Sequence, residues 1–279
     1  MRRRTESSRI SAPPPGLKRF FEEYPFVCLE QKTSVAVGLR DEARWQQVVE
    51  AMPTYLDANG LARYFPGEGN NGNGGSPALT AYLLDVTHAS GFAIPPEIAQ
   101  RMERGLAAFA EGRIKPEYWS PQSDLVVRKL AAIEALTRRG NKPFSAISSL
   151  EIDLPRLPTS ALIDWYLIAK RLTSLPDRAA KLDAVQREIR NRLSYLGGRL
   201  VFTSERADYW WWLMVSGDAN AFRLIEAVID DPAWKDDLPA LVQGVMLRQQ
   251  RGRWLTTVSN VWASIALDKF GRKFERDAV

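Results

Sequence analysis

The sequence has few of the residues that build disulfide bonds and metal sites. Its 279 residues include one cysteine and one histidine. A single cysteine excludes an internal disulfide bond and a zinc site made of cysteine ligands, and a single histidine excludes the usual pairs of histidine ligands. We therefore expect no metal and no cofactor.

Long apolar runs are also missing. The longest strongly apolar run, residues 210–215, is far too short to span a bilayer. The chain starts with basic residues, but residues 5–16 are polar and proline-rich where a signal peptide needs an apolar stretch. As written, the chain is expected to carry no export signal, no anchor and no membrane contact of its own.

Clustered charge of one sign is absent as well. The 38 Lys and Arg residues are scattered among 33 Asp and Glu residues, which leaves a formal net charge of +5. Proteins that bind nucleic acids usually show a clustered basic face and a recognisable reading motif, and neither is visible here. Apolar residues make up 45% of the chain, enough for a sizeable core, so we predict a globular protein with no nucleic-acid partner.

Apolar residues recur at helical spacing through most of the chain. Residues 1–16 are expected to form a flexible, proline-rich lead-in and residues 17–279 the domain proper. Ser76-Pro77 predicts a helix start, and Gly140 and Gly197-Gly198 lie where left-handed helix ends are expected. Two of the stripes are Leu79, Tyr82, Leu83 and Val86, and then Leu182, Val185, Ile189, Leu193 and Leu196. This pattern predicts an all-α fold of about ten helices in antiparallel hairpins, with no strand pair and at most a short extended piece at residues 200–202.

The lone cysteine lies three residues before a glutamine. Two intervening residues can turn back, so the side-chain carbonyl of Gln31 can acylate the sulfur of Cys28 with loss of ammonia. The product, an internal thioester, is a stored electrophile. The spacing is short, and by itself it is more typical of a buried cysteine that packs as a small apolar residue.

The surroundings of this pair resemble a known motif. Residues 24–34 read Tyr-Pro-Phe-Val-Cys-Leu-Glu-Gln-Lys-Thr-Ser. This run resembles the thioester motif of the α2-macroglobulin and complement superfamily, in particular its bacterial members. Further landmarks of the same family follow in the same order at residues 59–61, 64–67, 79–84 and 254–263. The resemblance covers residues 17–279.

The resemblance implies a fold and a site. The fold would be an α/α toroid in which inner and outer helices alternate. Cys28 would be the leaving group of a thioester and Gln31 its acyl donor. Leu29 and Glu30 would support the motif. Tyr24 and Phe26 would keep water away from the thioester.

The resemblance also implies a function and a setting. In the family, a cleaved parent protein rearranges, and the exposed thioester acylates a lysine of the attacking protease. Each site reacts once, so this is covalent trapping by an inhibitor and not enzyme turnover. Target proteases and adjacent domains of a longer parent would be the partners. Bacterial members are extracytoplasmic, which implies the periplasm or cell envelope.

Two positions depart from the family pattern. The residue before the cysteine is usually glycine, and here it is Val27, whose β-branched side chain disfavours a positive φ. Many animal members carry a downstream histidine that directs the acyl group to hydroxyl acceptors. The only histidine, His88, follows residues 79–84 too early for that position, so we do not assign it the role and expect direct acylation of amines.

Two other functions remain open. An enzyme on an α/α toroid, of the glycosidase or cyclase type, would need paired carboxylates with separated pKa values, and the sequence identifies no such pair. A scaffold that has lost the thioester is the other alternative. Other features have simpler interpretations: a surface loop for the glycine-rich residues 67–75, helix packing for the aromatic residues 209–212, and loop ends or helix starts for the acidic pairs at 230–231 and 236–237.

Overall fold

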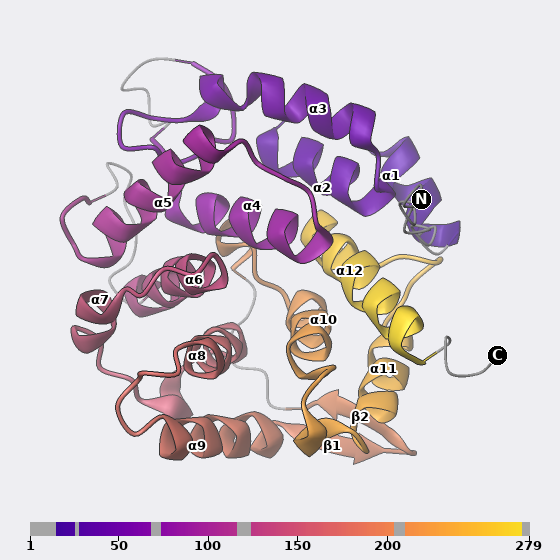
Figure 1. Ribbon diagram of the computed structural model, residues 1–279. Helices are drawn as coiled ribbons and strands as arrows, with labels where there is room; N and C mark the ends of the chain where they lie inside the picture. The colour runs from indigo at the N-terminus through magenta and orange to yellow at the C-terminus, as the bar shows by residue number, and fades with distance from the viewer. Residues whose placement is uncertain (1–14, 26–27, 68–73, 116–123, 204–209, 275–279) are drawn as a thin grey trace, which may run out of the picture.

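Six helices contact one another in a closed cycle. The computed structural model describes residues 15–25, 28–67, 74–115, 124–203 and 210–274 (Figure 1). In the order of the cycle the helices are α2 (Leu29–Leu39), α4 (Pro77–Ser90), α6 (Leu125–Arg138), α8 (Thr159–Arg171), α10 (Gly217–Val228) and α12 (Thr257–Phe274). Each packs on the next, and α12 packs back on α2. The first and last parts of the described chain thus meet and close the ring.

The remaining helices lie outside this ring. They are α1 (Pro15–Glu23), α3 (Glu42–Ala51), α5 (Pro96–Ala110), α7 (Phe144–Ser148), α9 (Arg178–Asn191) and α11 (Leu238–Met246). Short 3-10 turns occur at Met52–Tyr55, Leu154–Arg156, Trp211–Leu213 and Pro232–Trp234. The prediction of an all-α protein is confirmed, and inner helices alternate with outer ones along the chain (Figure 1).

The composition of each helix explains its place. In α4 every residue from Pro77 to Thr87 is buried, and in α8 every residue from Thr159 to Ala169 is buried. Helices that are apolar around most of their circumference lie in the interior. In contrast, α9 buries only Val185 and Ile189 and exposes charged residues elsewhere. The core therefore lies between the ring helices and beneath the outer ones.

Two predicted helix ends are confirmed. The Ser76 hydroxyl accepts a hydrogen bond from the Leu79 N–H, and Pro77 is the first residue of α4. Gly140 lies just after α6 with φ 87°. A residue without a Cβ adopts this left-handed conformation at little cost, so Gly140 ends the helix.

One element was predicted wrongly. Leu193 and Leu196 do not extend the helical stripe of α9. They lie in β1 (Leu193–Leu196), which pairs antiparallel with β2 (Arg199–Phe202) in the register Leu193 to Phe202. Gly197 and Gly198 have φ 58° and 79° and form the two-residue turn of this hairpin, and they are not the end of a helix.

Other expectations are met in part. Within the aromatic run, the rings of Trp210 and Trp212 lie 6.5 Å apart and pack on the core beside a 3-10 turn, not on an α-helix. Asp231 caps the 3-10 turn at Pro232–Trp234, and Asp237 precedes α11, as expected for acidic residues at helix starts. α1 begins at Pro15, two residues before the predicted domain start. Most of the glycine-rich loop, residues 68–73, lies outside the described residues.

Candidate functional site

Cys28 and Gln31 meet at the start of α2. Cys28 is the residue that precedes the helix, with an extended backbone at φ −99° and ψ 165°. Its sulfur accepts a hydrogen bond from the backbone N–H of Gln31, and the Gln31 side-chain oxygen lies 3.5 Å from the Cys28 nitrogen. This reciprocal arrangement is a capping box, in which the side chains of the cap and the third helical residue face one another. A thioester would join the same two side chains.

The loop before α4 holds this first turn in place. The Leu29 N–H, which has no partner within the helix, donates to the Tyr64 carbonyl oxygen at 2.9 Å. The helix then continues with the Lys32 N–H donating to the Cys28 carbonyl oxygen at 3.0 Å. Both backbone contacts fix the position of Cys28 relative to the body of the protein.

Of the two predicted shielding residues, Tyr24 is placed beside the pair. Its hydroxyl lies 3.4 Å from the Gln31 side-chain nitrogen, which donates to it, and its ring packs against Phe20. Phe26 and Val27 lie outside the described residues.

Cys28 is nearly buried. Only 8% of its surface is exposed. Burial raises the pKa of its thiol, the negative charge of Glu30 raises it further, and the Gln31 backbone N–H opposes the shift. A free Cys28 is therefore a protonated thiol at neutral pH, and its thiolate is a poor leaving group.

The Glu30 side chain points away from the surface, toward the ring of six helices. It is 7% exposed, and its Oε1 accepts hydrogen bonds from the Ser34 hydroxyl at 2.6 Å and the Thr257 hydroxyl at 2.8 Å. Ser34 also bonds the Tyr82 hydroxyl at 2.7 Å. Burial raises the pKa of Glu30, and the two hydroxyl donors oppose the shift.

Beside the pair lies a shallow groove between α2 and α3. Its volume is about 230 Å³, and Leu29, Val48 and Ala51 contribute its apolar lining. The Lys32 ammonium lies on the groove and donates to the Tyr55 hydroxyl at 3.0 Å. Lys32 is thus tied to Tyr55, although it follows Gln31 directly in the sequence.

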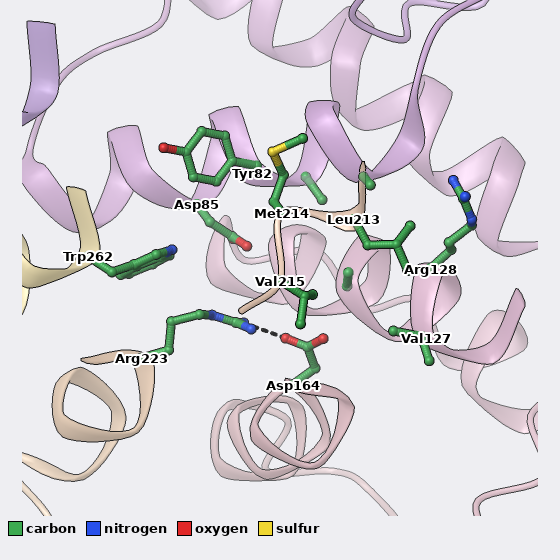
Figure 2. A pocket seen from close by; sticks show the side chains of 13 residues that line it. Tyr82, Asp85, Val127, Arg128, Asp164, Leu213, Met214, Val215, Arg223 and Trp262 are labelled. Atoms are coloured by element: carbon green, nitrogen blue, oxygen red, sulfur yellow. Dashed lines mark hydrogen bonds and ion pairs between the residues drawn. The ribbon is translucent and has the colours of Figure 1, made fainter. Parts of the chain in front are cut away.

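A second group of charged residues lies at the centre of the ring and was missed by sequence reasoning. Figure 2 shows Asp85, Asp164 and Arg223 converging on a cavity that Trp262 also lines. Arg223 donates to Asp164 at 2.5 Å. Burial raises the pKa of Asp164 to about 6 although Arg223 opposes the shift, and burial with the charge of Glu134 raises the pKa of Asp85 well above its ordinary range. The signal was available as single acidic residues inside otherwise apolar helices.

The cavity between these charged residues is small. It measures about 40 Å³, which holds a few water molecules.

His88 lies in the last turn of α4. Partial desolvation and the nearby Arg138, Arg139 and Arg171 lower its pKa.

Comparison with known proteins identifies the fold. By sequence, the chain matches no family model and no curated protein. By structure, it is similar to native α2-macroglobulin from Escherichia coli, with a TM-score of 0.64 and 18% identity over 92% of the chain. The fold is that of a part of bacterial α2-macroglobulins.

Two further solved structures of such proteins match equally well. Salmonella α2-macroglobulin reacted with methylamine has a TM-score of 0.66 and 18% identity over 90% of the chain. Trypsin-activated α2-macroglobulin from Escherichia coli has a TM-score of 0.62 and 17% identity over 93%. The chain spans 17–18% of the length of these three neighbours. Among the described residues, no helix is long and apolar enough to cross a membrane.

Proposed function

We propose that this chain is the thioester domain of a bacterial α2-macroglobulin-like inhibitor, which traps proteases by acylating their lysines. The observation that carries the proposal is the pairing of Cys28 and Gln31 across the first turn of α2. The fold shared with bacterial α2-macroglobulins supports it, since one such structure was obtained after reaction with methylamine and another after activation by trypsin.

Ring formation requires the two side chains to meet, and the capping box brings them together. The Cys28 sulfur attacks the side-chain carbonyl carbon of Gln31, and a carbon–sulfur bond forms while the carbon–nitrogen bond breaks. The thiol proton leaves with the departing nitrogen as ammonia. The Gln31 oxygen already lies 3.5 Å from the Cys28 backbone nitrogen, so the helix start holds the reactants close before reaction.

Trapping opens this thioester by the attack of an amine. The amine of a protease lysine attacks the same carbonyl carbon, an amide bond forms, and the carbon–sulfur bond breaks. The amine proton passes to the departing Cys28 thiolate. The site is consumed once, and the product is a protein crosslinked to its target.

A stored thioester has to be kept from water. In the chain itself, Tyr24 covers one side of Gln31, and we assign Phe26 the same task. Exposed apolar side chains also occur next to residues that hold the turn: Phe65, 50% exposed, follows Tyr64, and Leu255, 83% exposed, lies two residues before Thr257. We propose that adjacent domains of a longer parent cover this region, with the parent in the periplasm or cell envelope.

The experiment is intact-mass measurement and peptide mapping before and after methylamine, with thiol titration. A thioester predicts a chain lighter by one ammonia, which gains methylamine at Gln31 and releases one thiol at Cys28. Cys28→Ala is the matched control and should show no mass deficit and no gain. For the chain alone, without covering domains, we expect a free Cys28 and either glutamine or glutamate at position 31.

The longer parent then decides between trapping and a scaffold without a thioester. The parent should react with methylamine and form a covalent complex with trypsin, and Cys28→Ala should abolish both. A parent that keeps an unmodified Gln31 and a free thiol would contradict the proposal and favour the scaffold.

A further inference from the structure

Glu30 connects the reactive turn to the seam of the ring. Ser34 belongs to α2 itself, whereas Thr257 is the first residue of α12 and lies 227 positions away in sequence. Through Ser34, the contacts extend to Tyr82 on α4. One buried carboxylate therefore gathers side chains from the three helices that meet at the start of α2.

The direction of these hydrogen bonds is defined by chemistry. Glu30 Oε1 lies 2.6 Å and 2.8 Å from two hydroxyls, and a carboxylate can only accept. Because Ser34 uses its single proton on Glu30, the Tyr82 hydroxyl donates to Ser34. All donors thus point toward Glu30, an arrangement that favours the carboxylate and opposes the rise in pKa that burial causes.

Glu30 is also the charged neighbour of the reactive sulfur. Cys28 and Glu30 are two residues apart in the first turn, and both are nearly buried. The charge of Glu30 raises the pKa of the Cys28 thiol, and burial, with the charges of Glu30 and Cys28, raises the pKa of Tyr82 well above its ordinary value. Tyr82 is therefore neutral, and of the two acids Glu30 is the one whose charge acts on the Cys28 thiol.

We propose that Glu30 is a positioning residue for the Cys28–Gln31 pair, which holds the first turn of α2 against α12 and keeps a negative charge beside the Cys28 sulfur. The consequence for reactivity rests on the proposed function. A carboxylate beside the sulfur disfavours the departing thiolate and so slows premature opening of the thioester. The hydrogen bonds and the charge are two separable parts of this role.

Two substitutions separate the hydrogen bonds of Glu30 from its charge. Glu30→Gln keeps an oxygen that accepts from Ser34 and Thr257 but removes the charge. Glu30→Asp keeps the charge but shortens the side chain by one methylene, so it no longer reaches both hydroxyls. Glu42→Gln, at an exposed carboxylate that starts the neighbouring α3, is the charge-matched control.

The experiment measures the rate of Cys28 alkylation by iodoacetamide against pH, on methylamine-treated protein. This form has a free thiol whether or not a thioester had formed. In Glu30→Gln the midpoint of the profile should fall by about half a pH unit or more, which is about a threefold rise in thiolate below the midpoint. Glu30→Asp and Glu42→Gln should keep the wild-type midpoint, and in the longer parent Glu30→Asp should take up less methylamine than the wild type.

A Glu30→Gln profile that superimposes on the wild type would overturn the proposal, as would an equal shift in Glu30→Asp. If Glu30→Gln does not fold, Thr257→Val and Thr257→Ser decide. The valine variant, which lacks the donor, should show altered Cys28 alkylation, and the serine variant should match the wild type; two identical variants would refute the role. A shifted Glu30→Gln profile together with a longer wild-type parent that takes up no methylamine would support the placement of Glu30 and contradict the thioester.

Discussion

At the scale of single residues, the buried charges around Glu134 determine whether Asp85 carries a proton. Glu134 accepts hydrogen bonds from Arg138 at 2.9 Å and Arg171 at 2.5 Å, and these cations hold the pKa of Glu134 far below its ordinary value. Burial and the charge of Glu134 raise the pKa of Asp85. Asp85 Oδ1 lies 3.4 Å from Arg138 Nε, but neither it nor the buried Glu134 Oε2 has a hydrogen-bond donor, and a proton on Asp85 satisfies this need. Asp85 is therefore the protonated member of the pair.

This assignment predicts that Asp85→Asn is tolerated. An amide supplies the same donor to Glu134 without a titrating proton. A carboxyl whose pKa is raised in the folded state contributes stability below its ordinary value of 3.8, and loses it as pH rises through the raised pKa. The free energy of unfolding of Asp85→Asn should thus lie within about 1 kcal/mol of the wild type near pH 4 and exceed it increasingly as pH rises.

Urea unfolding at several pH values measures this difference. Glu134→Gln is the contrasting variant, because it leaves Arg138 and Arg171 without their shared carboxylate in the interior. It should lower the free energy of unfolding by about 3–5 kcal/mol. Equal losses in the two variants would show that Asp85 is ionised.

Some contacts of the site join residues that are close in sequence, and others join residues that are far apart. Cys28 and Gln31 are three positions apart, so a sequence can reveal the pair, and the structure brings their side chains together. The partnership of Glu30 with Thr257 spans almost the whole chain and depends on how α12 returns to α2. The same holds for Asp85 and Asp164, which only the closed ring brings to one cavity. The sequence shows single acidic residues inside apolar helices, but nothing local shows which of them meet.

At the scale of elements, helices were predictable and the hairpin was not. Apolar stripes and caps such as Ser76 are local signals that survive in the fold. In residues 193–202 the spacing of Leu193 and Leu196 fits a helix as well as a strand, since a short apolar run has no decisive period. The turn decides, because Gly197 and Gly198 both adopt positive φ and allow two short strands to pair.

The packing of α1 on α2 gives a second prediction. A Cβ placed on Gly38 would lie 2.3 Å from the ring of Phe21, so Gly38→Ala forces α1 away from α2. Overpacking of this kind costs about 1–3 kcal/mol. Tyr24 directly follows α1, so it should also leave Gln31, and Cys28 should be alkylated faster at a fixed pH. Urea unfolding and iodoacetamide kinetics measure the two effects.

Rescue separates this mechanism from general destabilisation. Phe21→Leu in the Gly38→Ala background replaces the rigid ring with a smaller, flexible side chain. The double variant should recover part of the unfolding free energy and slow Cys28 alkylation again. If the two losses simply add, the contact between Gly38 and Phe21 is not the cause.

At the scale of the whole molecule, stability depends on how the ring closes. α12 packs on both α10 and α2, so the last described helix joins the first part of the domain (Figure 1). Ser264 donates to the Gly38 carbonyl oxygen at 3.3 Å, and Arg40 at the end of α2 pairs with Asp268 at 2.6 Å. Asp268 also pairs with Arg272, its neighbour one turn later on α12. The seam therefore has a polar contact at each end, with Glu30 and Thr257 at the reactive turn and Arg40 and Asp268 at the other.

The last prediction concerns this seam. Asp268→Asn leaves the Arg40 and Arg272 cations, of which Arg40 is only 12% exposed, without their carboxylate. The loss should lower the free energy of unfolding by about 2–4 kcal/mol, because an almost buried cation remains unpaired. Asp183→Asn breaks a helix pair with Arg187 in which both side chains are about two-thirds exposed, and it should cost less than about 0.5 kcal/mol. Hydrogen exchange of the backbone amides should locate the effect. Faster exchange in α2 and α12, with exchange in α6 and α8 unchanged, identifies the seam as the point where the ring of helices opens. Uniformly faster exchange in all the ring helices would contradict this prediction.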